Sequence, residues 1–358
     1  MATGTVLPSA YAAFFAGRKT AHRSKGPKGV NIKKAEQYDE DDGCLDFTTD
    51  CGTNKRRLLG CPDADADAGR AKKSKRITAG SGSSSWYGSI HDYECLDMIS
   101  QGAYGAVYRA RHKKTHEIVA VKKEFGGLCE STLTEISILR SIRHPSVVEY
   151  KQVVSDDLDG IYVVMEYMEY DLHEYLKKNP SIDLPQVKRL MKELLEGVQH
   201  LHEKEVMHRD LKPSNLLLNA EEPGKLKICD FGLSSRFEDK PCTPHVGTLW
   251  YRAPELFLGA HEYLPAVDMW SVGCIMAEFF LGKVLFRGES EIEQLQIIVT
   301  NLEQPHCELQ HKFAAANALK GGPLLTQSGF ELLSRLLTYS PQDRITAREA
   351  LGHWWFQE

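Results

Sequence analysis

Strand-forming and helix-forming patterns are segregated along this chain, and this order constrains the fold more than any other feature. Short runs rich in β-branched and aromatic residues dominate from Tyr93 to Tyr167, whereas helical periodicity dominates after Asp171. Strands that precede helices, instead of alternating with them, are typical of the α+β class. The sequence therefore predicts an α+β protein with two lobes, one β-rich and one α-helical.

The predicted helices differ in how they are expected to pack. Leu133–Ser141 is a helical stretch among the strands, and Leu184–Leu201 repeats its apolar residues on one face. Pro265–Leu281 is apolar nearly all round and is followed by Gly282, which predicts a buried helix that stops at the glycine. The predicted strands are Tyr93–Ser100, Ala106–Arg111, Ile118–Lys123, Val147–Val154, Ile161–Tyr167 and Leu226–Cys229.

Residues 1–90 differ from the rest in composition. Basic and acidic runs alternate there without apolar periodicity, and the segment ends in the linker-like sequence Gly80–Ser85. This segment is net basic although the whole chain has a formal charge of −5, so the remainder is acidic. We therefore predict a disordered tail over residues 1–90, and we expect the acidic body not to bind nucleic acid.

The overall composition excludes several classes of protein. With 42% hydrophobic residues the chain is neither fibrous nor wholly disordered. We expect no membrane association, because no stretch of about 18 apolar residues occurs. Nine scattered cysteines without zinc-type spacing are typical of a reducing compartment.

Two basic clusters in the tail bear on localisation. Lys55–Arg57 and Lys72–Arg76 are spaced like a bipartite nuclear-import signal, which favours the nucleus over the cytoplasm. The acid-free stretch before Glu36 also fits an organellar transit peptide, which we consider a weaker alternative.

The first chemical motif is a glycine-containing turn followed by a lysine in a strand. Gly102 and Gly105 lie between two predicted strands, so their bare backbone can approach phosphate oxygens without opening a helix. Lys122 falls within the next apolar strand, where an ammonium group is costly unless it meets an anion. Glu135, on the short helix, is a plausible partner.

The second motif places polar groups after the long amphipathic helix. His208–Asn215 reads His-Arg-Asp-Leu-Lys-Pro-Ser-Asn, and Asp230-Phe231-Gly232 follows a predicted strand. Mg²⁺ prefers oxygen ligands, which Asp230 and Asn215 offer. Asp210 is then the carboxylate left to accept a hydroxyl proton, and Lys212 can neutralise a transferred phosphoryl group.

Taken in order, these motifs resemble the protein-kinase family over residues 93–356. Trp250–Glu255, Asp268–Ile275 and Ser290–Leu295 resemble the cyclin-dependent kinase family, including its divergent plant members, and Lys212 is typical of Ser/Thr kinases. The resemblance implies a two-lobed kinase domain, with the N-lobe over about 93–168 and the C-lobe over about 169–356. It also implies ATP, Mg²⁺ and protein substrates.

The resemblance further implies how ATP is held. The backbone of Glu166 and Met168 would bond the adenine edge, Met165 would be the gatekeeper, and Asp171 would face the ribose. Four apolar residues would sandwich the base: Ile99, Val107, Ala120 and Leu217.

The regulatory parts depart from the family pattern. Tyr104 remains as an inhibitory phosphosite and Thr243 as the activation-loop phosphosite, but Thr134 and Ser235 replace two arginines that would receive the phosphate. The segment before Thr134 is also shortened. We therefore expect the activity to depend only weakly, or not at all, on a cyclin-like activator. Arg252 implies a preference for proline after the phosphoacceptor, although Gly247 replaces a valine of those relatives.

Two functions stay open from the sequence. An active Ser/Thr kinase is favoured, because every phosphoryl-transfer residue is present. A catalytically weak ATP-binding scaffold is the alternative, because Ser100 replaces the first glycine of the loop and Thr134 and Ser235 replace two regulatory arginines. A metabolic ATP-using enzyme is disfavoured by the absence of a G-x-x-x-x-G-K-[ST] loop.

Overall fold

The structure is a computed structural model, and it describes residues 88–102, 105–158, 160–180, 182–219, 225–238, 246–260, 264–303, 309, 312–313 and 323–358. The predicted tail lies outside these residues up to position 87. The last three residues of the predicted tail belong to the fold instead, because Gly88 and Ser89 pair with a sheet strand and Ile90 is buried. The described helices include none that is long and apolar enough to cross a membrane.

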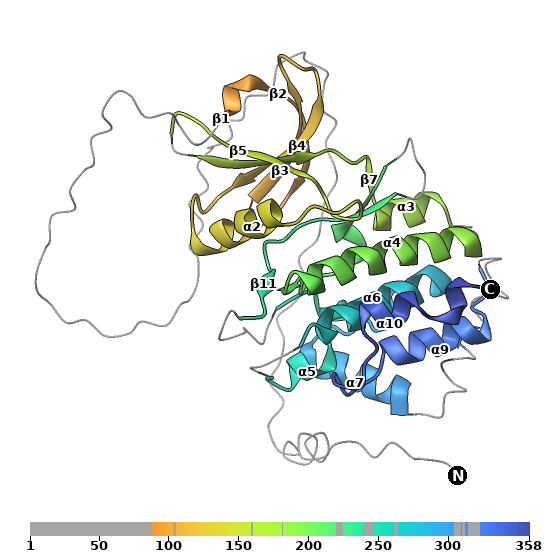
Figure 1. Ribbon diagram of the computed structural model, residues 1–358. Helices are drawn as coiled ribbons and strands as arrows, with labels where there is room; N and C mark the ends of the chain where they lie inside the picture. Colours follow the sequence, from red (N-terminus) through yellow and green to blue (C-terminus); the bar gives the residue numbers. More distant parts are fainter. Residues whose placement is uncertain are drawn as a thin grey trace, which may run out of the picture. The chain divides into compact units, whose positions relative to one another are not determined.

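The first lobe is a six-stranded sheet with one helix, and Figure 1 shows its strands together in orange to yellow-green. The strand order is β1-β5-β6-β4-β3-β2, with antiparallel pairs except for β1 and β5. Its elements are β1 (Gly88–Ser89), η1 (Ile90–Asp92), β2 (Tyr93–Gln101), β3 (Gly105–His112), β4 (Ile118–Glu124), α2 (Glu130–Ser141), β5 (Tyr150–Ser155) and β6 (Ile161–Glu166).

The second lobe is mainly helical, as predicted. In it α4 packs against α6 and α10 (Figure 1). Its elements are β7 (Tyr170–Asp171), α3 (Leu172–Lys178), α4 (Leu184–Glu203), β8 (Val206–Met207), η2 (Pro213–Asn215), β9 (Leu216–Leu218), β10 (Leu226–Ile228), β11 (Ser235–Arg236), η3 (Leu249–Tyr251), α5 (Pro254–Phe257), α6 (Ala266–Leu281), α7 (Glu291–Glu303), α9 (Gln327–Leu336), α10 (Ala347–Leu351) and η4 (Trp354–Phe356).

The two helices with the strongest sequence signals form as predicted. Asp183 caps α4, where its side chain accepts a hydrogen bond from the Gln186 backbone, and the apolar face of α4 is buried. Helix α6 is buried nearly all round, and it ends where Gly282 adopts a φ of +61°. That left-handed conformation favours glycine, so the residue fixes the end of the helix.

Two predicted boundaries are wrong. The strand predicted over Val147–Val154 begins only at Tyr150, because Val148 donates its backbone N–H to Ile228 of β10 at 2.9 Å and so leaves the sheet. Helix α2 begins at Glu130, three residues before the predicted start, because its first turn is polar and lacks the apolar period.

Candidate active site

Lys122 and Glu135 form a buried ion pair at the inner face of the first lobe. The Lys122 Nζ atom donates to both Glu135 carboxylate oxygens at 2.7 Å, and it lies 3.2 Å from Glu124 and 3.5 Å from Asp230. Burial alone lowers the pKa of Lys122, but the three carboxylates together raise it above its ordinary value. The ammonium group therefore stays charged, as binding of phosphate requires.

Asp230 owes its position to the residues on either side. It follows β10 with a φ of +64°, and the next residue, Phe231, is buried with its ring 5.1 Å from that of His208. A non-glycine residue at positive φ is strained and persists only where its surroundings hold it. Anchoring of Phe231 turns the Asp230 carboxylate toward Lys122 and leaves it about half exposed.

Asp210 is the centre of a second cluster, which contains all three predicted catalytic residues. Lys212 Nζ donates to its carboxylate at 2.7 Å, and the Asn215 side-chain amide donates to its backbone oxygen at 2.8 Å. The backbone N–H and hydroxyl of Thr248 both donate to the other carboxylate oxygen at 2.8 Å. Lys212 also reaches the Thr248 hydroxyl at 3.0 Å, so these groups form one network.

Asp268 holds the loop that carries Asp210, a role that the sequence analysis missed. Its carboxylate lies wholly buried in α6 and accepts the backbone N–H groups of His208 and Arg209 at 2.9 and 2.8 Å. It also lies 2.9 Å from the ring nitrogen of His202. Burial raises the pKa of Asp268, but the hydrogen bond and charge of His202 hold it below its ordinary value.

A charged residue in an otherwise apolar helix was the signal that could have revealed Asp268, because such a group must find partners. The Arg209 backbone, at a φ of +68°, is the strained position that this carboxylate supports. The sequence around Thr248 gave no comparable sign that this residue contacts Asp210.

The residues predicted to surround the adenine lie on strands that the sheets bring together. Ala120 pairs with Met165 across β4 and β6, Ser100 pairs with Val107, and Asp171 pairs with Leu217. Val107, Ala120 and Leu217 are only partly buried and Ile99 is 47% exposed, as the open wall of a site requires.

The segment that joins the lobes is also ordered. Glu166 ends β6, where its carboxylate pairs with Lys227 at 2.7 Å, and Met168 is buried just beyond it. The Asp171 carboxylate caps α3 through the Glu174 backbone at 2.7 Å. The remaining carboxylate oxygen of Asp171 is not engaged in that cap.

The glycine turn closes through one hydrogen bond, in which the Gly102 N–H donates to Gly105 O at 2.9 Å. A Cβ atom at Gly105 would lie only 2.4 Å from the Lys123 carbonyl, so glycine is needed for the close approach of β3 to β4. The two predicted regulatory residues, Tyr104 and Thr243, lie outside the described residues.

Asn215 and Asp230 fit a divalent cation. The Asn215 amide nitrogen is directed to Asp210, with bonds of 2.8 and 3.2 Å, so its amide oxygen is the atom left to bind a metal. No group of three or more His, Cys, Asp or Glu side chains in the described part could hold a metal. Mg²⁺ normally keeps several waters and phosphate oxygens, so two protein oxygens are sufficient.

Arg252 connects two neighbouring segments at the far side of Asp210. Its Nη2 atom donates to the Gly247 carbonyl at 2.9 Å, and its Nη1 atom pairs with Glu291 at 2.6 Å. Gly247 adopts a φ of +82°. Nearby, Glu255 forms a buried two-bond pair with Arg344, at 2.7 and 2.9 Å, which ties α5 to the C-terminal part of the lobe.

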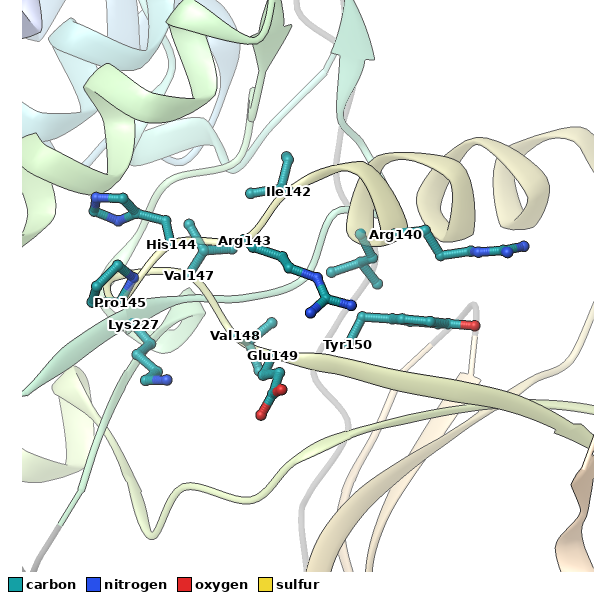
Figure 2. A pocket seen from close by; sticks show the side chains of 11 residues that line it. Arg140, Ile142, Arg143, His144, Pro145, Val147, Val148, Glu149, Tyr150 and Lys227 are labelled. Carbon is teal, nitrogen blue, oxygen red and sulfur yellow. The ribbon is translucent and has the colours of Figure 1, made fainter.

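A hollow of about 360 Å³ lies between the loop after α2, the start of β5 and Lys227 of β10 (Figure 2). In Figure 2 Arg143 extends over this hollow toward Glu149 and Tyr150. None of the residues predicted to bind ATP lines it. The hollow is therefore distinct from the site built around Lys122 and Asp210.

Comparisons with known proteins agree with this geometry. A family model described as "Protein kinase domain" matches residues 93–356. The chain is 49% identical over 302 residues to cyclin-dependent kinase G-2 of Oryza sativa subsp. indica, an alignment that covers 75% of this chain and 42% of the relative. It is 44% identical over 307 residues to cyclin-dependent kinase G1 of Arabidopsis thaliana, covering 75% and 50%.

A human relative extends the comparison beyond plants. Identity to cyclin-dependent kinase 11B of Homo sapiens is 43% over 294 residues, covering 75% of this chain and 37% of the relative. The chain thus spans half or less of the length of these three relatives. With the kinase-domain match over most of its length, the chain belongs to the protein kinase family and is of the cyclin-dependent-kinase-like type.

Proposed function

We propose that this protein is a serine/threonine kinase that transfers the γ-phosphoryl group of ATP to a hydroxyl group of protein substrates, with Mg²⁺ as the metal. The observation that carries the proposal is the assembly of two networks, Lys122–Glu135–Asp230 and Asp210–Lys212–Asn215. Such transfer depends mainly on positioning of the reactants and neutralisation of their charge, and the two networks together supply both.

Each side chain has a defined task in this reaction. Lys122, held by Glu135, would bind the α- and β-phosphates. Asp210 would orient the substrate hydroxyl and accept its proton, with its carboxylate fixed by Thr248. Lys212 would neutralise charge on the transferred group, and it already lies within reach of Asp210.

Asp230 and Asn215 would hold the metal. When bound, Mg²⁺ supplies positive charge to the β- and γ-phosphate oxygens. The half-exposed carboxylate of Asp230 is open toward solvent, and Asn215 is kept in one orientation by Asp210.

We further propose that the kinase prefers proline after the phosphoacceptor. Arg252 already donates a hydrogen bond to the Gly247 carbonyl oxygen. This oxygen is therefore not available to the backbone N–H of the substrate residue that follows the phosphoacceptor. Proline has no backbone N–H, so a substrate with proline at this position leaves no hydrogen-bond donor unsatisfied. Replacement of the valine of relatives by Gly247 does not remove this arrangement, because glycine adopts the positive φ without strain.

The partners proposed are protein substrates and a cyclin-like activator, with weak dependence on the latter. Thr134 lies on α2 in place of an arginine, and Arg236 donates to Ser141 at 3.3 Å instead of standing free to receive a phosphate. Assays with and without candidate cyclins test this, and a hundredfold stimulation would contradict it.

Nuclear localisation is proposed from the two basic clusters, which lie outside the described residues. Replacing Lys72, Lys73, Lys75 and Arg76 by alanine should move a fluorescent fusion from the nucleus to the cytoplasm. Fluorescence in an organelle would instead favour the transit-peptide alternative.

The main experiment measures transfer of radiolabelled phosphate from ATP to a generic basic protein in the presence of Mg²⁺. Loss of a positioned general base typically costs about 10²–10⁴-fold in rate, so the variant Asp210→Asn should fall by that amount. Both proteins should still bind ATP. If wild type and Asp210→Asn transfer phosphate equally slowly, the protein is a scaffold and not a kinase.

A further inference from the structure

The hollow of Figure 2, about 360 Å³ in volume, combines an apolar wall with several basic side chains. The apolar part of its lining is formed by Leu139, Ile142, Pro145, Val147 and Val148. The basic part is formed by Arg140 at the end of α2, by Arg143 and His144 in the loop after it, and by Lys227 of β10. Ligand sites are typically hollows of this kind, in which a few polar groups are set into an apolar surface.

Part of the charge around the hollow is already compensated. Lys227 Nζ donates to both Glu166 carboxylate oxygens, at 2.7 and 2.8 Å. The Glu149 carboxylate lies 3.6 Å from Lys151 Nζ, which also pairs with Glu117 at 2.6 Å. Lys227 therefore offers little free charge, and Glu149 keeps part of its negative charge.

His144 contributes no charge near neutral pH. Its Nδ1 atom accepts the Ser146 backbone N–H at 3.1 Å, and its ring stacks on that of His200 with 4.9 Å between the centroids. Burial and the neighbouring His200 lower the pKa of His144. The ring is therefore neutral at pH 7, and the arginines are the cations that remain.

The two arginines are not engaged by other groups. Within the described part of the chain, neither Arg140 nor Arg143 has a hydrogen-bond or ion-pair partner, and both residues are exposed. In Figure 2 Arg143 extends over the hollow, and Arg140 projects from the end of α2. Either guanidinium group can therefore turn toward a ligand without breaking a bond.

The backbone that carries the arginines is held in place. Arg140 lies in the last turn of α2, and the loop that contains Arg143 is bonded to β10. In these bonds Val148 N–H donates to Ile228 O, and Ile228 N–H donates to Ser146 O, both at 2.9 Å. Only the two side chains would have to move when a ligand binds.

We propose that Arg140 and Arg143 bind a phosphate monoester in this hollow. Each guanidinium group can donate two parallel hydrogen bonds, and a phosphate monoester offers three terminal oxygens to receive them. Its charge near pH 7 is about −1.5 to −2, which attracts two cations despite the remaining charge of Glu149. A carboxylate offers only two oxygens, which a single arginine would occupy.

The group that carries the phosphate would lie against the apolar part of the wall, which includes Ile142 and Val147. A phosphorylated side chain of a protein and a small phosphorylated molecule share this chemistry. The two sources differ in what surrounds the phosphate, so two probes distinguish them.

Calorimetric titration of the full chain tests the site with phenyl phosphate and with an acetylated Gly-phosphoserine-Gly peptide. Arg140→Gln and Arg143→Gln each remove one guanidinium group, and Arg189→Gln changes an exposed arginine of α4 that does not line the hollow. We expect each of the first two variants to weaken binding about tenfold, and the control to leave it unchanged. An imido analogue of ATP is present throughout, and any residual binding beside Lys122 is common to all variants.

A fourth variant should have the opposite effect. Glu149→Gln removes the negative charge that opposes the ligand, so it should strengthen binding about threefold. A variant that only disturbed the fold would not improve binding.

The titrations have distinct outcomes. Tighter binding of the peptide supports the site and assigns the phosphate to a protein side chain, whereas tighter binding of phenyl phosphate supports it and assigns the phosphate to a small molecule. Affinities that are unchanged in Arg140→Gln and Arg143→Gln overturn the proposal. Affinities for both probes that do not exceed that of inorganic phosphate also overturn it, because the hollow then holds an adventitious ion only.

Modification by phenylglyoxal gives a second measurement, on the unmutated protein. Mass spectrometry follows the reaction rate at Arg140, Arg143 and Arg189. With phenyl phosphate at about four times its Kd, the rate at the first two should fall about fivefold, because only the unoccupied site reacts. Arg189 should react at its original rate.

Positive charge at the end of α2 is also favourable toward the helix dipole, without any ligand. If that were the whole role of Arg140 and Arg143, phenyl phosphate would protect neither residue from phenylglyoxal. Absence of protection would therefore overturn the proposal, whatever the catalytic activity of the protein.

Discussion

Arg252 donates a hydrogen bond to the carbonyl oxygen of Gly247 at 2.9 Å, five residues earlier in the chain. The bond exists because Gly247 adopts a φ of +82°, which turns this peptide group toward the guanidinium. A second bond, to Glu291 at 2.6 Å, holds the other end of the guanidinium. The Arg252–Gly247 relationship leads to two measurable expectations. One concerns the preference for proline in the substrate, and the other concerns the effect of replacing Gly247.

Arg252→Ala should reduce the preference for proline after the phosphoacceptor. The variant frees the Gly247 carbonyl to accept an N–H from substrate, so non-proline peptides gain a hydrogen bond worth about 1 kcal/mol. The ratio of kcat/KM for matched Ser-Pro and Ser-Ala peptides should fall about fivefold. Glu291→Gln keeps the Arg252–Gly247 bond and should leave that ratio unchanged. A ratio that falls equally in both variants would show that Glu291, not Gly247, sets the preference.

Gly247→Ala should impair the protein more than Gly259→Ala does. Both glycines have positive φ, +82° and +74°, so alanine costs about 1–2 kcal/mol of strain at either position. At Gly247 a Cβ atom would also lie 2.5 Å from the Arg209 carbonyl, whereas nothing lies within 4 Å at Gly259. Thermal unfolding measures the loss of stability, and kcat measures the loss of turnover. We expect kcat to fall only in Gly247→Ala, because Arg209 adjoins Asp210. Equal effects of the two variants would mean that the backbone around Arg209 moves to accommodate the added Cβ atom without further loss of stability or turnover.

Lys122→Met should make the stability of the fold fall as pH rises. The variant leaves the buried carboxylates of Glu135 and Glu124 without their cation. Burial already raises the pKa of Glu135, and without Lys122 the pKa rises further. A carboxyl whose folded pKa exceeds its unfolded value of about 4.3 stabilises the fold below that value and loses this contribution as pH rises through the folded pKa.

Thermal unfolding between about pH 5 and 8 measures this effect, since ordinary Glu is ionised in the unfolded chain over that range. The double variant Lys122→Met/Glu135→Gln should flatten the pH profile, because it removes the main titrating group. A Lys122→Met profile parallel to that of wild type would show that water enters and solvates the carboxylates.

The grouping of side chains in the candidate active site could be predicted from sequence, because their chemistry is local and a buried charge is costly without a partner. Lys122 in an apolar strand requires an anion, and Glu135 supplies it at 2.7 Å. Asp210, Lys212 and Asn215 lie within six residues, so a single loop brings them together. The two lobes followed equally directly from the order of strands and helices.

Other features depend on contacts between distant segments and could not be predicted. Val147 and Val148 have strand-forming side chains, but a partner 80 residues away, Ile228, draws them out of the sheet. Thr248 supports Asp210 from 38 residues away, and no local pattern announces it. Asp268 had a local signal, a charge in an apolar helix, but its partners became visible only in the fold.

Asp268→Asn should lower both turnover and stability. The amide offers one acceptor oxygen in place of two, so the backbone N–H of either His208 or Arg209 loses its partner and the Asp210 loop shifts. A misplacement of about 1 Å can cost about 10²-fold in rate, so a clear fall in kcat with little change in KM is expected. Asp183→Asn is the control, because asparagine caps a helix about as well as aspartate does.

The pH dependence of the Asp268→Asn effect has a fixed sign. The pKa of Asp268 is held below its ordinary value, so its carboxylate stabilises the fold above the unfolded pKa of about 3.9 and loses this contribution as pH falls through the folded pKa. The difference in unfolding free energy between wild type and Asp268→Asn should therefore be constant above about pH 5 and shrink in more acidic buffer. Chemical unfolding at several pH values measures it. A difference that grew on acidification would show that Asp268 is protonated in the native protein, and the support of the His208–Arg209 backbone would then have to come from a neutral carboxyl.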